Sequence, residues 1–195
     1  MNPDDLSPVG KKFFSKVEFD NNEQLHMEVR KDPFGLFLIY LGGAVATLTI
    51  FGLLVLGGAA FDTGDVGDGV GLDGGSLRAL IIGVGFFLTI FSVVITAVAA
   101  FLYTNNVVLI TSEKITQQLY LSLFNRKISQ LSIADVQDVT VRQQGIFAHI
   151  FDYGTLTIET AGEQSNYTFT FTPKPYETAK ALVGSHEADV SRHGN

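Results

Sequence analysis

The sequence predicts a membrane protein in which a transmembrane hairpin of two helices precedes an α+β domain, a bent antiparallel sheet capped by a C-terminal helix. Three observations predict this fold class. Two uncharged apolar runs, 34–60 and 79–103, each exceed the roughly 20 residues that a helix needs to cross a bilayer. Beyond residue 105, apolar and polar residues alternate as they do in half-buried strands. The segment 175–184 returns to helical spacing.

These patterns divide the chain into six consecutive segments. They are a cytoplasmic N-terminal segment (1–33), a first transmembrane helix (34–61), an extracytoplasmic loop (62–76), a second transmembrane helix (77–104), the α+β domain (105–184) and a disordered tail (185–195). Lys and Arg flank the apolar runs on the side of both termini, whereas the loop has four Asp and no basic residue. The positive-inside rule therefore predicts the inner cell membrane, with both termini in the cytoplasm.

The two apolar runs are predicted to be anchors. Neither contains an ionisable residue, whereas transporters and proton relays place charged groups inside the membrane. Small residues recur at helical-neighbour spacing, with Gly42, Ala46 and Thr49 in one run and Gly85 and Thr89 in the other. Such strips let helices approach closely in lipid, so we expect a tight antiparallel hairpin, with self-association as an option.

The loop between the runs offers four carboxylates, Asp62, Asp65, Asp68 and Asp73, among glycines. Calcium is bound by about six to eight oxygens, so the loop is a candidate calcium site. Its spacing differs from that of an EF-hand loop and lacks the closing Glu. A flexible, solvated connector is the favoured interpretation, and weak calcium binding is the alternative.

The segment after the second run is predicted to be rich in strands. The strand-like segments are 107–110, 114–121, 126–133, 136–141, 155–160 and 167–171. Pro175 suits the first turn of the following helix and Gly184 can end it. The apolar run 145–154 has helical spacing and predicts a short helix that plugs against the sheet. Residues 23–30 also alternate, which predicts an additional edge strand.

Several motifs follow one another along this region. They are V-L-I-T-S-E-K-I (108–115), L-F-N-R-K (123–127), L-S-I-A-D-V-Q-D-V (131–139), the run G-I-F to T-A-G (145–162) and F-T-P-K-P (171–175). With the hairpin and the lead-in E-V-R-K-D-P (28–33), they resemble the bacterial pleckstrin-homology family, as represented by YdbS-like membrane proteins with two spans. The resemblance implies a membrane-tethered pleckstrin-homology-like domain. It implies a fold more than a chemistry, because the motif residues are mostly turn and core positions.

The candidate ligand-binding residues are the basic residues Lys114, Arg126, Lys127 and Arg142. Lys114 follows the first hairpin turn and Arg126 and Lys127 follow the second, so we expect both turns to share one basic rim. Near a membrane, such a rim can contact anionic lipid head groups at about 1 kcal/mol per contact. A solvated surface is the alternative, because the net charge is −7 and no segment is strongly basic. For the same reason nucleic acid is not an expected partner.

Catalysis, metal binding and a cofactor are not predicted. His149 and Asp152 are three residues apart and could form a base and its orienting group, but no nucleophile motif accompanies them. The chain has no Cys and no HExxH spacing. We therefore expect a non-catalytic interaction module that binds a protein or peptide, or assembles with itself, through a sheet edge or a groove beside the C-terminal helix. Sensing of anionic lipid head groups through the basic rim is the alternative.

Overall fold

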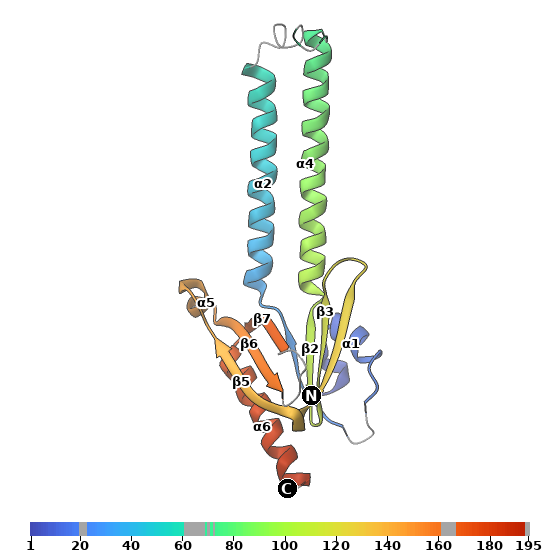
Figure 1. The fold of residues 1–195 in the computed structure, drawn as a ribbon, viewed down its shortest axis with the longest axis vertical. Helices are drawn as coiled ribbons and strands as arrows, with labels where there is room; N and C mark the ends of the chain where they lie inside the picture. Colours follow the sequence, from blue (N-terminus) through green and yellow to red (C-terminus); the bar gives the residue numbers. More distant parts are fainter. Residues whose placement is uncertain (20–22, 61–68, 70, 72, 161–166, 194–195) are drawn as a thin grey trace. The chain divides into compact units, whose positions relative to one another are not determined.

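The structure is a computed structural model that describes residues 1–19, 23–60, 69, 71, 73–160 and 167–193. The chain forms two compact units (Figure 1). One comprises Met1–Leu36 together with Leu102–Asn195 and is called the β unit below. The other comprises Phe37–Phe101 and is called the helical pair. The N-terminal segment therefore belongs to the same unit as the strands that follow the second apolar run.

The helical pair is formed by most of α2 (Pro33–Ala60) and α4 (Gly74–Thr104). Both helices are long and apolar enough to cross a membrane, and almost none of their residues are buried. The two helices approach each other at small residues, because a Cβ atom on Gly43 would meet Thr96 and one on Gly85 would meet Leu54. Gly42, which the sequence placed in the contact strip, has no neighbour at its Cβ position. The close approach of the two helices is thus confirmed, but on α2 the contact is made at Gly43, one residue after the predicted Gly42.

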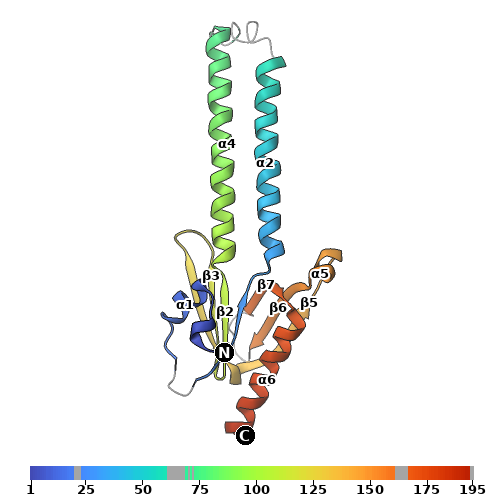
Figure 2. The same cartoon turned by 180° about the vertical axis from the view of Figure 1, so that it is seen from behind.

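The β unit contains two antiparallel sheets (Figures 1 and 2). The first has the order β1 (Leu25–Arg30), β2 (Val107–Thr111), β3 (Lys114–Tyr120) and β4 (Arg126–Ser132). The second has the order β5 (Val136–Arg142), β6 (Tyr153–Thr160) and β7 (Tyr167–Pro173). The short 3-10 helix η2 (Ile133–Asp135) turns the chain from β4 into β5, so the predicted bent sheet is divided in two. All six predicted strands are confirmed, and β1 confirms the added edge strand.

The main core lies between the two sheets and under α6 (Pro175–His193). Apolar side chains from the first sheet (Val29, Ile110), the second sheet (Leu156, Phe169) and α6 (Leu182) meet there. Because alternate residues of a strand point to opposite faces, each strand contributes every second side chain to this core.

A second apolar cluster covers the other face of the first sheet. Phe13 of α1 (Pro8–Phe14) packs there with Leu6, against Val107 and Leu109 of β2. Ser7 caps α1 by accepting a hydrogen bond from the Gly10 N–H at 3.0 Å. Strand β2 is therefore buried on both faces, which explains its continuous apolar sequence. The N-terminal segment was not expected to contain α1 or the preceding 3-10 helix η1 (Pro3–Asp5).

Helix α6 does not end at Gly184, so the predicted disordered tail is wrong for residues 185–193. Gly184 does not adopt a positive φ angle, which a left-handed helix cap would require. Side chains beyond it bond to the body of the β unit. The Ser185 hydroxyl lies 3.2 Å from His26 Nδ1, and His186 Nδ1 lies 2.8 Å from the Ile133 carbonyl oxygen. These contacts offset the roughly 1 kcal/mol that glycine costs inside a helix.

Candidate functional site

The predicted basic rim is not formed, because β3 and β4 place its members at opposite ends. Lys114 begins β3 and pairs with Ser132, whereas Tyr120 at the other end pairs with Arg126. Six residues at about 3.3 Å each separate the two ends by roughly 20 Å. Successive turns of an antiparallel meander alternate between the ends of the sheet, which the expectation of one shared rim overlooked.

Lys114 is engaged by the N-terminal segment. Its ammonium group forms an ion pair with Glu23 at 3.0 Å and donates to the Glu18 carbonyl oxygen at 2.8 Å. It also lies 5.3 Å from the centre of the Phe19 ring. The Lys114 side chain is 17% exposed and the Glu23 side chain is fully buried. These contacts give Lys114 a structural role in fastening Glu18, Phe19 and Glu23 to the start of β3.

The chain leaves the β unit and returns to it at adjacent points. Two residues separate the end of β1 from the start of α2, and two residues separate the end of α4 from the start of β2. The Tyr103 hydroxyl donates to the Asp32 carbonyl oxygen at 2.6 Å, which joins the two connections. The Asp32 carboxylate also accepts a hydrogen bond from the Phe34 N–H at 2.8 Å, as an N-cap does for a helix. We call the end of the β unit that carries Asp32, Phe34 and Tyr103 the junction end.

Aromatic rings pack together at the junction end. Phe34 lies 4.4 Å from Phe151, 5.6 Å from Phe147 and 5.4 Å from Tyr153, measured between ring centroids. Tyr153 in turn stacks on Phe171 at 5.0 Å. Such pairs contribute about 0.5–1.5 kcal/mol each beyond the area that they bury. The start of α2 is thereby attached to the second sheet and to α5 (Ile146–Ile150).

Phe171 reaches this aromatic cluster through an unusual backbone conformation. Its φ angle is +56°, in the left-handed region that residues other than glycine rarely adopt. The register of β6 and β7 shifts at the same place, between Gly154 and Leu156. A β-bulge of this kind redirects a side chain, here the Phe171 ring toward Tyr153 and Tyr103.

Lys31 places a positive charge among these rings. Its ammonium nitrogen lies 5.2 Å from the centre of the Tyr103 ring and 5.9 Å from that of Phe169. It also donates a hydrogen bond to the Thr170 hydroxyl at 3.2 Å. Burial lowers the pKa of Lys31 from its usual value, because a charged amine loses hydration there.

Two exposed apolar protrusions flank the junction end, and the sequence did not predict either of them as exposed. The first is α5, which was predicted correctly as a helix but not as a plug. Ile146 is 76% exposed and Ile150 is 65% exposed, while Ala148 alone among the five helical residues is buried. The second is the turn of the β3–β4 hairpin, residues 121–125, where Phe124 is 99% exposed.

The hairpin turn belongs to the junction end because of its hydrogen bonds. The Tyr120 N–H donates to the Asn106 side-chain oxygen at 2.7 Å, and the Gln118 amide donates to the Asn105 carbonyl oxygen at 3.0 Å. Asn105 and Asn106 connect α4 to β2. The sequence did contain a sign of this exposed apolar turn, because the turn carries leucine and phenylalanine, whereas turns usually favour polar residues and glycine.

Three of the four predicted basic residues do lie at this end. Arg126 and Lys127 begin β4 directly after the apolar turn, and Arg142 ends β5 three residues before Gly145 and α5. All three side chains are exposed. The structure therefore places Arg126 and Lys127 beside the β3–β4 turn and Arg142 near α5, and it separates Lys114 from this end.

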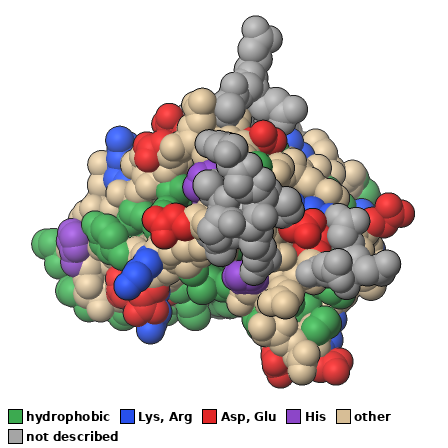
Figure 3. All heavy atoms as spheres, turned by 90° about the horizontal axis from the view of Figure 1, so that it is seen from below, with side chains coloured by type: hydrophobic (Ala, Val, Ile, Leu, Met, Phe, Trp, Pro, Cys, Tyr) green, Lys and Arg blue, Asp and Glu red, His purple; other side chains and the backbone are tan. Residues whose placement is uncertain are grey.

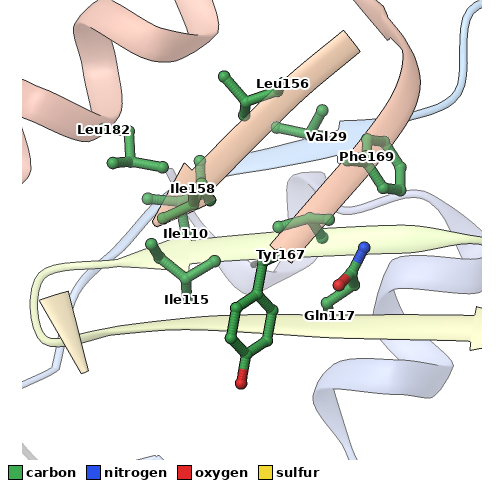
Figure 4. Close-up of a pocket in the computed structure, with 10 residues that line it drawn as sticks. Val29, Ile110, Ile115, Gln117, Leu156, Ile158, Tyr167, Phe169 and Leu182 are labelled. Atoms are coloured by element: carbon green, nitrogen blue, oxygen red, sulfur yellow. The ribbon is translucent and has the colours of Figure 1, made fainter. Parts of the chain in front are cut away.

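The cavity between the two sheets and α6, as the described residues line it, is too small for a ligand. Figure 4 shows side chains of both sheets and α6 converging on a cavity of about 10 Å³. That volume is at the lower limit for a single water molecule. The polar member of its lining, Gln117, donates to the Thr168 carbonyl oxygen at 3.4 Å. The cavity is therefore a packing gap in the apolar core.

The described residues also show no metal-binding cluster of His, Asp and Glu. Asp62, Asp65 and Asp68 of the candidate calcium loop lie outside the described part of the chain. Asp73 bonds to the Ser76 N–H and hydroxyl instead, and these bonds lower the pKa of its carboxyl group. His149 is exposed on α5.

The face of the molecule drawn in Figure 3 is not strongly basic. In Figure 3, acidic and basic side chains are interspersed over the face in view, with no basic patch. This distribution agrees with the net charge of −7. An extended anionic ligand such as nucleic acid binds to a continuous basic surface, which this face does not provide.

The comparisons with known proteins agree with this fold. A model of the bacterial PH domain matches residues 37–183, which include most of both apolar helices and all strands except β1. A search of curated proteins found no match. One similar solved structure is the crystal structure of a DUF1696 family protein with a pleckstrin-homology domain from Shewanella loihica, at 13% identity. The similarity covers 42% of this chain and 70% of that chain, with a TM-score of 0.33. Because the family model matches about three quarters of the sequence, the chain belongs to the bacterial PH domain family.

Proposed function

We propose that the protein is a membrane-anchored, non-catalytic interaction module. In this proposal α2 and α4 cross the inner membrane of a bacterium, and the β unit lies at the cytoplasmic face. There it binds a protein or peptide partner, or a second copy of the chain. Membership of the bacterial PH domain family supports a binding role for the β unit.

One observation carries the anchoring. The apolar side chains of α2 and α4 are exposed around both helices, and water disfavours so much apolar surface. With 28 and 31 residues, the helices extend over about 42 and 46 Å, which exceeds the roughly 30 Å of a bilayer's hydrocarbon core. The Thr47 and Ser92 hydroxyls lie 3.0 Å apart between the helices, so these polar groups satisfy each other.

The outer strands of the two sheets support the docking of a partner. Among the described residues, β4 and β5 each pair with a single neighbouring strand, and most of their side chains are exposed. An unpaired strand edge presents N–H and C=O groups that a peptide in extended conformation can bind. We therefore place the partner along β4 and β5, rather than beside α6.

Photo-crosslinking in native membranes tests this docking surface. A photoreactive amino acid would replace Gln130 on β4 or Gln137 on β5, and Lys180 on α6 serves as an exposed control. We expect adducts from the two strand positions and none from the control. An adduct of twice the chain's mass identifies self-assembly, and any other mass identifies a different partner. Monomer alone at both strand positions would contradict the proposal.

The anchoring and its sidedness need a separate test. The chain has no cysteine, so Asp73→Cys and Lys180→Cys each introduce a single thiol. In intact cells, a membrane-impermeant maleimide should label the thiol at position 73 and spare the one at position 180. Release of the protein from membranes by alkaline carbonate would refute the anchoring, and the reverse labelling pattern would refute the orientation.

A second candidate function is the binding of anionic lipid head groups. Arg126, Lys127 and Arg142 favour it, because all three lie exposed at the junction end. Replacing the three by glutamine should lower the amount of anionic phospholipid that purifies with the protein. Glutamine at three exposed lysines of the N-terminal segment (Lys11, Lys12 and Lys16) provides a control with the same change in charge. Equal phospholipid content in the two triple variants would exclude this function.

A further inference from the structure

We propose that the β unit inserts two apolar protrusions, the β3–β4 turn and α5, into the head-group boundary of the bilayer. This proposal rests on the proposed anchoring by α2 and α4. It goes beyond that anchoring because it assigns a second membrane contact, made by the β unit itself. The ligand is the lipid surface, and the contact is apolar insertion rather than recognition of a head group.

The first step of the argument is the exposure of the two protrusions. Phe124, Ile146 and Ile150 are large apolar side chains that project from folded, well-connected elements. The β3–β4 turn is held by bonds between Leu121 and Asn125, and α5 is held by the Phe34 ring. A rigid element with an exposed apolar surface indicates a contact with another apolar medium.

The second step identifies that medium through the positions of the protrusions. Phe34 is the first residue of the apolar run of α2, and the Phe151 ring next to α5 stacks on it at 4.4 Å. On the other side, Tyr120 is the last residue of β3 before the turn, and its N–H donates to the side chain of Asn106, two residues beyond α4. Each protrusion is thus linked directly to a point where a predicted span begins or ends. Figures 1 and 2 show them at opposite sides of the β unit.

The third step is their composition. Neither the turn (121–125) nor α5 contains an acidic residue. Exposed Arg126 and Lys127 follow the turn directly, while exposed Arg142 lies four residues before α5 and exposed Asp152 lies two residues after it. Aromatic and aliphatic tips with adjacent Lys and Arg are typical of segments that lie in the membrane interface, since long basic side chains extend to the phosphates. A protein partner could also cover the tips, and the test below separates the two cases.

Tryptophan fluorescence in vesicles tests the proposal on the full chain. The natural sequence has no tryptophan, so each variant carries a single probe. The probe variants are Phe124→Trp and Ile146→Trp, and both positions are exposed enough that folding should not change. The control is Val183→Trp, on the exposed side of α6. It lies near His186, which bonds to η2 at the other end of the β unit.

The protein would be reconstituted into phosphatidylcholine and phosphatidylglycerol vesicles with or without brominated acyl chains. Bromine quenches only a fluorophore that it approaches in the lipid. We expect brominated lipid to lower the emission of both probe variants at least about two-fold, as insertion to 5–10 Å predicts, and to leave the control unchanged.

Two results would overturn the proposal while leaving the anchoring intact. One is emission at long wavelength and no quenching in a protein that resists alkaline extraction, which means that the tips lie in water. The other is emission at short wavelength without quenching by brominated lipid, which means that protein covers the tips. Alkaline extraction of the reconstituted protein would instead refute the anchoring, and with it both proposals.

Discussion

Phe13 provides a test of whether the N-terminal segment shares the fold of the β unit. It is 1% exposed, and its cluster includes Val107 and Leu109 of the strand that follows the second apolar helix. Truncating a buried phenylalanine to alanine costs about 3–5 kcal/mol, because apolar contact is lost and a cavity remains. A whole domain is stable by only about 5–15 kcal/mol. We therefore expect Phe13→Ala to remove a large part of the stability of strands that lie about 100 residues away in the sequence.

The matched control is Phe124→Ala, the same chemical change at a side chain that is 99% exposed. A surface substitution of this kind changes the free energy of unfolding by about 0.5 kcal/mol or less. The two variants lose the same atoms, so a difference between them reports burial alone.

Pulse proteolysis of the full chain in a mild detergent, across a series of urea concentrations, measures both variants. With a dependence on urea of about 2 kcal/mol/M, a loss of 4 kcal/mol lowers the unfolding midpoint by about 2 M. The midpoint of the Phe124→Ala variant should stay near that of the natural chain. Equal midpoints for the two variants would refute the argument that residues 1–36 are part of the core.

Three further predictions follow from other contacts. Lys114→Met should destabilise the β unit by about 3–5 kcal/mol, because it removes the ion pair with a carboxylate whose side chain is fully buried. Lys127→Met at an exposed position should have little effect, and equal urea midpoints for the two variants would contradict this. Gly43→Ile should lower the midpoint of thermal unfolding of the helices, measured by far-UV circular dichroism, because the new side chain meets Thr96 of the facing helix. Gly42→Ile should leave the midpoint unchanged, and a larger effect at position 42 than at position 43 would contradict the packing. Burial lowers the pKa of Lys31, so just below pH 10.5 the unfolded chain binds more protons than the folded chain, and the free energy of unfolding should rise with pH through that interval. Urea denaturation at a series of pH values should show this rise for the natural chain and lose it for Lys31→Met. An unchanged rise in the variant would refute the assignment.

The sequence by itself determined the elements whose signals are local. An uncharged run of more than 20 residues has few alternatives to a long apolar helix, and α2 and α4 follow both runs. Alternation with a period of two predicts a strand wherever one face is buried, and β3 to β7 follow that pattern, whereas β2 was predicted from its short apolar run. Even the short α5 was predicted from its spacing. The order of these elements and their motifs was sufficient to indicate the family.

Only the tertiary structure decided which surfaces are covered and which residues meet. Helical spacing in 145–154 is the same whether the apolar face is buried or exposed, so α5 was expected to be a plug. The pairing of Lys114 with Glu23 depends on a segment about 90 residues earlier in the chain, which no local pattern reports. The contact at Gly43 rather than Gly42 depends on the rotation of one helix against the other. Period and hydrophobicity are properties of a segment, whereas burial is a property of its neighbours, and neighbours distant in the sequence are placed only by the complete fold.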